Sequence, residues 1–454
     1  MYKIVGLKIL IMFGLVFLAS CSSSSSEKQT VDEISKEIIE LLVNGETEEI
    51  YEWFFTEELQ ESLSKVEFSQ MWKERTESAG NYLGYTTINI SSRGETFEVM
   101  ETSLEYQNLV FQLRMIFNNE TKLVSLHLSD GVANIQLPDN VIEEEVVVGE
   151  GTHYELGGTL TLPQNKDNDN TVPAVVLVHG SGPSDRNSAV FAYQPFRDLA
   201  WGLAKHGIAV LRYDKRTYIY GSDMTPTEVA ELTVHEETVE DAILAGELLK
   251  NDPRIDSNNV YVIGHSLGGM LAPRIDTVGG EFAGLIIMAG SLRPLWEIIY
   301  DQNMAILTES EMDETERVEM IQTVEKEYER ALQLMFWSDE KVKEEKLFGL
   351  PAGYFKEMEH FDTKELVSKL DKPILVLQGE KDFQVYYEKD FSLWKEVLKD
   401  HDQAMTISYP ELNHFFIQYE GEAQGTLAEY EHPGVVHDAV IQNIAEWVLE
   451  QVNN

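Results

Sequence analysis

A serine lies between two glycines in the segment Gly264-His265-Ser266-Leu267-Gly268, which fits the pattern Gly-x-Ser-x-Gly. Residues 260–263 before it are apolar and mostly β-branched, as in a buried strand, and residues 270–275 can form a helix after it. Strand, sharp turn and helix form the context in which this pattern exposes a nucleophilic serine. Gly264 and Gly268 are needed because a Cβ beside the serine would clash with the neighbouring strand or helix. We therefore predict Ser266 as a nucleophile rather than an ordinary loop serine.

An acid and a base are expected to follow this serine along the chain, each on a loop after a late strand. The serine needs the base to remove its proton, and the base needs the acid to orient it. The apolar strand at 375–377 leads through a glycine-containing turn to Asp382, which lies beyond that turn. We predict Asp382 as the acid, with Glu380 as the near alternative and Asp371, before the strand, as a further one. In so acidic a chain any one of these carboxylates can be a solvated side chain.

The predicted base is His414, one of 11 histidines. The final strand ends at Tyr409, and the loop Pro410-Glu411-Leu412-Asn413-His414 follows it directly. Three other histidines lie in this part of the chain. His401 precedes the strand, His432 stands too far beyond it, and His437 lies near the start of the closing helix.

Acyl transfer also requires two backbone N–H groups directed at the oxygen that becomes negative. Leu267, directly after the serine, is the first expected donor. The second is expected from the loop His179-Gly180-Ser181-Gly182-Pro183, where Gly180 and Gly182 let the backbone approach a substrate closely. Ser181 is the predicted donor and Gly182 the alternative. The next two charged residues, Asp185 and Arg186, either form a structural ion pair that braces the loop or contact substrate.

The elements that position these residues alternate between strand and helix from about residue 141. This alternation predicts a doubly wound, mainly parallel sheet. A hairpin at 144–148 and 158–162 opens it, and further strands are expected at 174–178, 208–211, 285–288 and 406–409. Helices are expected at 196–205, 238–249 and 439–452. Residues 291–370 contain several predicted helices, which form either a lid over the site or a peripheral helix pair without a gating role.

The first part of the chain has a different pattern. Residues 31–80 carry apolar side chains at helical spacing, with one helix expected to carry Ile50, Trp53, Phe54 and Leu59, and residues 85–130 alternate as strands do. This order predicts a small α+β accessory domain over 31–135, followed by the larger domain over 141–454. The small domain resembles the nuclear-transport-factor-like cone, a curved sheet wrapped on helices.

Residues 1–20 have the features of an export signal, since Lys3 and Lys8 precede or border an apolar core at 9–19 that is too short to span a membrane comfortably. The tetrapeptide Leu18-Ala19-Ser20-Cys21 resembles a bacterial lipobox, with an ordinary secretory signal as the alternative. We therefore expect lipidation at Cys21, a serine-rich tether over 21–30, and an exported lipoprotein anchored to the outer face of the cell membrane.

Composition narrows the choice of partners and cofactors. The 454 residues include 35 basic and 79 acidic side chains, for a net charge of −44, which disfavours nucleic acid as a partner. Cys21 is the only cysteine, so an intrachain disulfide, a catalytic cysteine and a cysteine metal cluster are excluded. No metal-binding spacing of histidines is present, and no cofactor is expected.

The motifs His-Gly-Ser-Gly-Pro with Asp-Arg-Asn, Gly-His-Ser-Leu-Gly-Gly, Gly-Glu-Lys-Asp and Asn-His-Phe together resemble those of bacterial serine carboxylesterases. These enzymes belong to the α/β-hydrolase superfamily, near its dienelactone-hydrolase and prolyl-oligopeptidase-like branch. The resemblance covers about 141–454 and implies a catalytic triad of Ser266, Asp382 and His414. Some esterases of this group carry a similar small N-terminal domain, whereas true peptidases of the prolyl branch carry a large one, for which this chain has no room.

The expected function is therefore a serine carboxylesterase that hydrolyses short acyl esters of small molecules through an acyl-enzyme. A thioesterase, an acyltransferase or a peptidase-like hydrolase would use the same triad. A surface lipoprotein that binds without catalysis is the alternative from another class.

Overall fold

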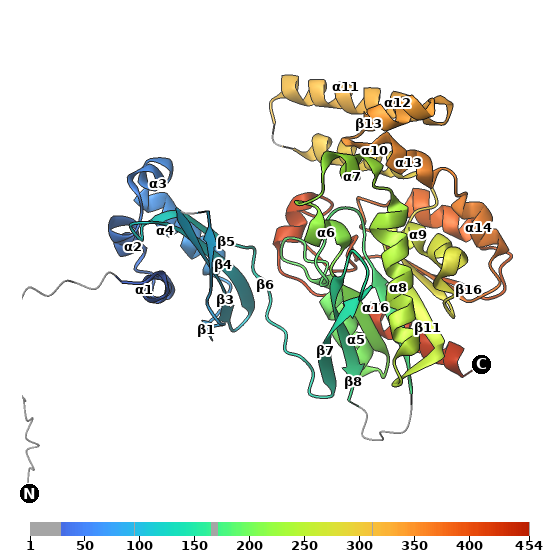
Figure 1. Cartoon of the computed structure of the whole chain (residues 1–454), viewed down its shortest axis with the longest axis horizontal. Helices are drawn as coiled ribbons and strands as arrows, with labels where there is room; N and C mark the ends of the chain where they lie inside the picture. The colour runs from blue at the N-terminus through green and yellow to red at the C-terminus, as the bar shows by residue number, and fades with distance from the viewer. Residues whose placement is uncertain (1–28, 95, 165–170, 311, 454) are drawn as a thin grey trace, which may run out of the picture. The chain divides into compact units, whose positions relative to one another are not determined.

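The computed structural model describes residues 29–94, 96–164, 171–310 and 312–453 (Figure 1). The predicted signal peptide, Cys21 and most of the predicted tether lie outside these residues. Within the described ranges, no helix combines the length and the apolar character needed to cross a membrane.

Four helices open the N-terminal part of the chain: α1 (Val31–Asn44), α2 (Thr47–Trp53), α3 (Glu57–Ser62) and α4 (Lys65–Thr76). The single helix expected around residues 50–59 is wrong, because the chain leaves α2 at Phe54 and starts α3 after Thr56. Phe55, buried between them, forms an isolated β-bridge with Leu123. The Thr56 side chain then accepts the N–H of Leu59 and caps the new helix.

The strands that follow form a six-stranded sheet in the order β1-β3-β4-β5, with β2 paired to β3 and β6 to β4. Burial alternates along β4, as expected for a sheet with one covered face. β1 was not predicted, because Gly84 interrupts its short pattern. The α+β class expected for this part is confirmed. The strands are β1 (Tyr82–Tyr85), β2 (Asn89–Arg93), β3 (Phe97–Tyr106), β4 (Leu109–Asn118), β5 (Leu123–Leu128) and β6 (Val132–Ala133).

The larger sheet has eight strands in the order β16-β15-β12-β11-β9-β10-β8-β7. The opening hairpin, β7 with β8, is antiparallel, and β8 also pairs antiparallel with β10. The other neighbours run parallel, so the predicted mainly parallel sheet is confirmed. Its strands are β7 (Val141–Val148), β8 (Leu156–Pro163), β9 (Val172–Val178), β10 (Ala209–Tyr213), β11 (Ile255–His265), β12 (Leu285–Met288), β15 (Ile374–Gly379) and β16 (Ala404–Tyr409).

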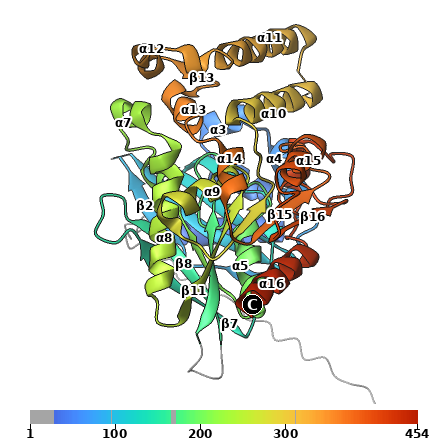
Figure 2. The ribbon, with the colours of Figure 1, turned by 90° about the vertical axis from the view of Figure 1, so that its right-hand side faces the viewer.

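Helices bury both faces of this sheet, which is why its central strands are continuously apolar. On β9, Val176 and Val178 share one core with α8 and α9, whereas Val175 and Leu177 share the other with α5 and α16. Figure 2 shows α8 and α16 on either side of the strands. The covering helices are α5 (Pro195–Lys205), α8 (Glu240–Asn251), α9 (Leu267–Ile275) and α16 (Asp438–Val452).

The segment at 291–370 is helical, as predicted, and most of it lies together at one end of the sheet (Figures 1 and 2). It also contains a short hairpin, β13 (Lys346–Leu347) with β14 (Leu350–Pro351), which the sequence did not predict. The positive φ angles of Phe348 and Gly349 close this hairpin. The helices of the segment are α10 (Leu295–Glu309), α11 (Glu314–Ala331), α12 (Asp339–Glu344), α13 (Ala352–Met358) and α14 (Thr363–Lys369).

Candidate active site

Ser266 occupies the turn between β11 and α9 with φ 55° and ψ −117°, a strained backbone for a residue with a side chain. Its N–H donates to the carbonyl oxygen of Met288 over 2.9 Å, which ties the turn to β12. A Cβ at Gly264 would lie 2.2 Å from the carbonyl oxygen of Gly268, and a Cβ at Gly268 would lie 2.3 Å from that of Val178. Both positions therefore admit only glycine, and the strand, turn and helix expected around Ser266 are present.

A cavity of about 270 Å³ lies beside this turn. The structure brings Ser266, His414 and Ser181 together in its wall, although they lie far apart in the sequence. Gln302 of α10 lines the same cavity, so the segment at 291–370 contributes to the site. None of the residues lining it, all within the described ranges, is Asp, Glu, Lys or Arg.

Asp382 and His414 form a buried pair, with 2.8 Å between Asp382 Oδ2 and His414 Nδ1. Asp382 Oδ1 accepts the backbone N–H groups of Gln384 and Val385 over 2.8 and 2.9 Å. A carboxylate with these donors around it is held as an acceptor, so Nδ1 of His414 carries the proton. In the neutral imidazole this leaves the lone pair on Nε2, the nitrogen that a base needs.

The rival acids and histidines have other contacts. Glu380 accepts the Ser408 hydroxyl over 2.7 Å, and Asp371 accepts the Gln403 amide over 3.3 Å. None of these rivals lines the cavity. Among the histidines, His401 bonds the carbonyl oxygen of Leu370, and His432 stacks on Tyr419. His437 accepts the N–H of Ala439 and caps α16.

The two predicted oxyanion donors both lie close to the serine. The N–H of Leu267 is the first of α9, and the first N–H groups of a helix have no partner within it. Gly180 lies against the serine, since a Cβ built on it would stand 3.1 Å from Ser266 Cβ. Ser181, which follows it, lines the cavity, whereas the alternative donor Gly182 does not.

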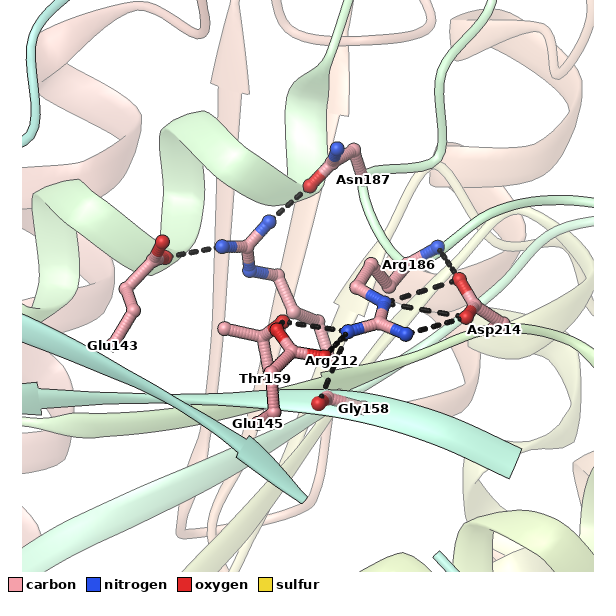
Figure 3. A network of polar contacts seen from close by, with 8 residues as sticks. All are labelled: Glu143, Glu145, Gly158, Thr159, Arg186, Asn187, Arg212 and Asp214. Carbon is pink, nitrogen blue, oxygen red and sulfur yellow. Dashed lines mark hydrogen bonds and ion pairs between the residues drawn. The ribbon is translucent and has the colours of Figure 1, made fainter. Parts of the chain in front are cut away.

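Arg186 braces the loop after β9 (Figure 3). Its guanidinium binds both carboxylate oxygens of Asp214, with 2.7 Å between Nη2 and Oδ2, and donates to the carbonyl oxygen of Gly158 over 3.1 Å. The hydrogen bonds to Asp214 raise the pKa of Arg186, despite partial burial. An ion pair between Asp185 and Arg186 was the wrong expectation, because Asp185 accepts the N–H of Ala189 instead. The role of Arg186 is nevertheless structural, as it does not line the cavity.

Two buried histidines beside the site are neutral. His265 donates from Nε2 to the carbonyl oxygen of His414 over 2.9 Å, so it supports the backbone of the predicted base. Burial, together with the nearby His414, lowers the pKa of His265 to about 3. Burial and the charge of Lys215 likewise lower the pKa of His179 to about 3. Neither ring therefore places a positive charge beside the serine near neutral pH.

Two supporting residues were missed at the sequence level. Gln378 donates to Asp382 Oδ2 over 2.9 Å and to the carbonyl oxygen of Val385 over 3.0 Å. Asn413 accepts the N–H groups of Phe415 and Ile417 through Oδ1 and so shapes the loop that carries His414. The sequence signal for Gln378 was a polar residue at the end of an apolar strand. The signal for Asn413 was its position next to the predicted base.

No cluster of three or more His, Cys, Asp or Glu side chains able to hold a metal ion occurs in the described part of the chain. The arrangement is instead that of a serine with a strained backbone, a histidine whose Nδ1 binds a buried carboxylate, and backbone N–H groups around one cavity. Such a set can perform acyl transfer to water.

Comparison with known families gives two matches. Residues 175–419 match the model described as the alpha/beta hydrolase family. Residues 35–126 match a model that describes a protein family of unknown function, DUF3887. Among curated proteins, the chain is 32% identical over 355 residues to Esterase EstD of Thermotoga maritima, and the alignment covers 78% of this chain and 80% of that protein.

Solved structures with similarity to this chain include Est1E from Butyrivibrio proteoclasticus, at 17% identity and a TM-score of 0.44, over 68% of this chain and 99% of that one. A dienelactone hydrolase from Anabaena variabilis matches at 16% identity and a TM-score of 0.37, over 68% and 98% of the two chains. The family match spans more than half of the sequence, and the curated relative aligns with most of it. This chain therefore belongs to the alpha/beta hydrolase family, as an esterase-like member, which confirms the fold class and the enzyme class that its sequence predicts.

Proposed function

We propose that this protein is a serine carboxylesterase in which Ser266 is the nucleophile, His414 the base and Asp382 the acid that orients it. The observation that carries the proposal is the buried Asp382–His414 pair, whose histidine shares a cavity wall with the strained Ser266. The similarity to a curated esterase over most of the chain supports the same reaction class.

In the proposed reaction, Ser266 Oγ attacks the ester carbonyl carbon while Nε2 of His414 takes its proton. The N–H groups of Leu267 and Ser181 bind the oxyanion of the tetrahedral intermediate, and one such donor typically lowers the barrier by about 3 kcal/mol. The intermediate then collapses, and the alcohol leaves with the proton from His414. Water attacks the acyl-enzyme with His414 again as base, which releases the acid and restores the serine.

The cavity supports small, uncharged esters as substrates. Its volume of about 270 Å³ is below the range of ~300–1,000 Å³ that is usual for sites of drug-sized ligands. Its wall combines apolar side chains such as Phe191 and Leu427 with the amides of Gln302 and Gln384, and none of its lining residues is Asp, Glu, Lys or Arg. An anionic ester would also meet the field of a chain with net charge −44. We therefore propose short acyl esters of neutral alcohols.

A fluorophosphonate probe and a series of aryl esters test this proposal. The wild-type protein is expected to react with the probe at Ser266 and to hydrolyse acetyl and butyryl esters faster than octanoyl esters. Ser266→Ala should lose labelling and lower kcat by at least ~10⁴-fold, as in other serine hydrolases. Ser408→Ala is a suitable control, because its hydroxyl binds Glu380 and neither residue lines the cavity. Equal labelling of wild type and Ser266→Ala would contradict the proposal.

A further inference from the structure

Lys215 is a buried cation directly behind the loop that carries Ser181. It is only 1% exposed and follows the end of β10. Its Nζ donates to the carbonyl oxygen of Gly180 over 2.9 Å, and its backbone N–H donates to the carbonyl oxygen of Ser184 over 3.0 Å. One lysine therefore holds the loop after β9 at two points, on either side of Ser181.

The first of these bonds acts on the peptide that contains the predicted oxyanion donor. The carbonyl of Gly180 and the N–H of Ser181 belong to the same peptide unit, and the described chain has no cis peptide bond. In a trans peptide these two groups point in opposite directions. Fixing the carbonyl oxygen on Lys215 thus directs the N–H of Ser181 away from the lysine. Gly180 itself lies against Ser266, since a Cβ built on it would stand 3.6 Å from Ser266 Oγ.

An ammonium group on the carbonyl oxygen also changes the strength of the donor. Hydrogen bonds in a chain polarise one another, so a peptide whose oxygen accepts from a cation has a more positive N–H. This effect is largest where water is excluded, as around Lys215. The same contact therefore both orients the Ser181 N–H and strengthens it.

We propose that Lys215 is a positioning residue for the oxyanion hole, which holds the Gly180–Ser181 peptide so that the Ser181 N–H faces the oxyanion formed at Ser266. The inference rests on the proposed function and adds to it a residue that does not line the cavity.

The surroundings of Lys215 keep the ammonium in place. Glu237 Oε1 lies 3.3 Å from Nζ and also accepts the hydroxyl of Thr217 over 3.0 Å. Glu237 Oε2 accepts the hydroxyl of Tyr354 on α13 over 2.5 Å. Burial lowers the pKa of Lys215, and the carboxylate of Glu237 opposes that shift. A buried ion pair adds little net stability, because the cost of desolvating two charges offsets much of their attraction.

Lys215→Met tests the proposal, because methionine fills similar space without the donor or the charge. Lys372→Met is a matched control: Lys372 Nζ also donates to a backbone carbonyl oxygen, that of Phe282 over 2.8 Å, and also pairs with a buried carboxylate, Asp276 over 2.9 Å. Lys372 lines no part of the cavity. Both variants lose a hydrogen bond to a backbone carbonyl oxygen and an ion pair with a buried carboxylate.

For aryl ester hydrolysis, Lys215→Met should lower kcat about tenfold or more with little change in KM, since an oxyanion contact acts on the transition state. A boronic acid, which becomes a tetrahedral anion on the serine, should bind more weakly by a similar factor. Lys372→Met should keep both values within about twofold of wild type. Should Lys215→Met fail to fold, Lys215→Gln replaces it, because its shorter neutral amide weakens the same hydrogen bond.

Two outcomes overturn the inference: a kcat for Lys215→Met no lower than that of Lys372→Met, or a lower kcat with unchanged boronic acid affinity. Either outcome counts against the inference only when turnover by the wild-type protein depends on Ser266. If the wild-type protein lacks such turnover, the proposed function fails instead, so the two failures are distinguishable.

Discussion

At the scale of single residues, the carboxylate of Asp382 has a fixed orientation because both of its oxygens are occupied. Two backbone N–H groups bind Oδ1, while the Gln378 amide and the His414 ring bind Oδ2. A side chain held by four donors cannot turn without losing several of them at once. The fixed carboxylate of Asp382 therefore also fixes the orientation of the His414 ring.

Asp382→Asn should lower kcat by about 10⁴-fold while the protein stays folded. The amide oxygen is expected to take the place of Oδ1, where two N–H groups require an acceptor. The amide nitrogen then faces His414 as a donor and forces the ring into the tautomer with its proton on Nε2, which cannot accept from the serine. Steady-state kinetics with an aryl ester, together with circular dichroism, measure both effects.

Glu380→Gln provides the comparison for this variant. Glu380 is the nearest alternative acid in the sequence, but its carboxylate binds the Ser408 hydroxyl. Its kcat should stay within about threefold of wild type, as for a substitution outside a catalytic unit. A large loss in Glu380→Gln with a small loss in Asp382→Asn would show that the acid is misassigned.

The sequence predicted Ser266, Asp382 and His414 because each follows the end of a predicted strand within a few positions. The residues that support them follow no such rule. Lys215 lies 35 positions from Gly180, whose carbonyl oxygen it binds, and only the parallel pairing of β9 with β10 brings them together. Contacts of this kind depend on the order of strands in the sheet, which local patterns do not contain.

At the scale of elements, the helical segment at 291–370 is part of the site. α10 contributes Gln302 to the cavity wall, and α13 contributes Tyr354, whose hydroxyl binds Glu237 in the body of the domain. Tyr354 is almost fully buried, and burial together with Glu237 raises its pKa well above the usual value, so the phenol stays protonated as the donor. The segment is therefore attached to the same buried group as Lys215.

Tyr354→Phe should lower the free energy of unfolding by about 1–3 kcal/mol, because it leaves a buried carboxylate oxygen short of one donor. Urea denaturation measures the change. Tyr300→Phe is the matched control in the same segment, since the Tyr300 ring packs against that of Tyr328 with 4.4 Å between centroids and would keep this contact as phenylalanine. An equal effect of the two substitutions would mean that the bond to Glu237 does not hold α13 in place.

The element boundaries also show what local patterns omit. The central strands of the large sheet were predictable, because burial on both faces makes them continuously apolar. The hairpin β13–β14 was not, since two-residue strands have no period and the turn depends on positive φ at Phe348. The break between α2 and α3 follows from the pairing of Phe55 with Leu123, 68 residues away. The helical spacing of apolar residues cannot indicate a break that depends on so distant a contact.

At the scale of the whole molecule, the catalytic proposal concerns one part of a chain with at least two other predicted parts. The region at 35–126 matches a family of unknown function and carries a sheet of its own. The first residues carry the predicted lipoprotein signal, which lies outside the described structure. Attachment to a membrane would place the esterase near substrates on the outer face of the cell, and this expectation depends on one residue, Cys21.

Cys21→Ala should release the full-length protein from the membrane fraction of a bacterial host and abolish incorporation of radiolabelled palmitate. Lipidation requires the thiol, and because Cys21 is the only cysteine, no other thiol can carry the label. Ser22→Ala, one residue further, should keep both the label and the membrane association. Since Cys21 precedes the residues proposed for catalysis by more than 150 positions, ester turnover per molecule should be equal in all three proteins. Unlabelled wild-type protein, or a Cys21→Ala variant that still sediments with the membranes, would contradict the lipid anchor while leaving the catalytic proposal intact.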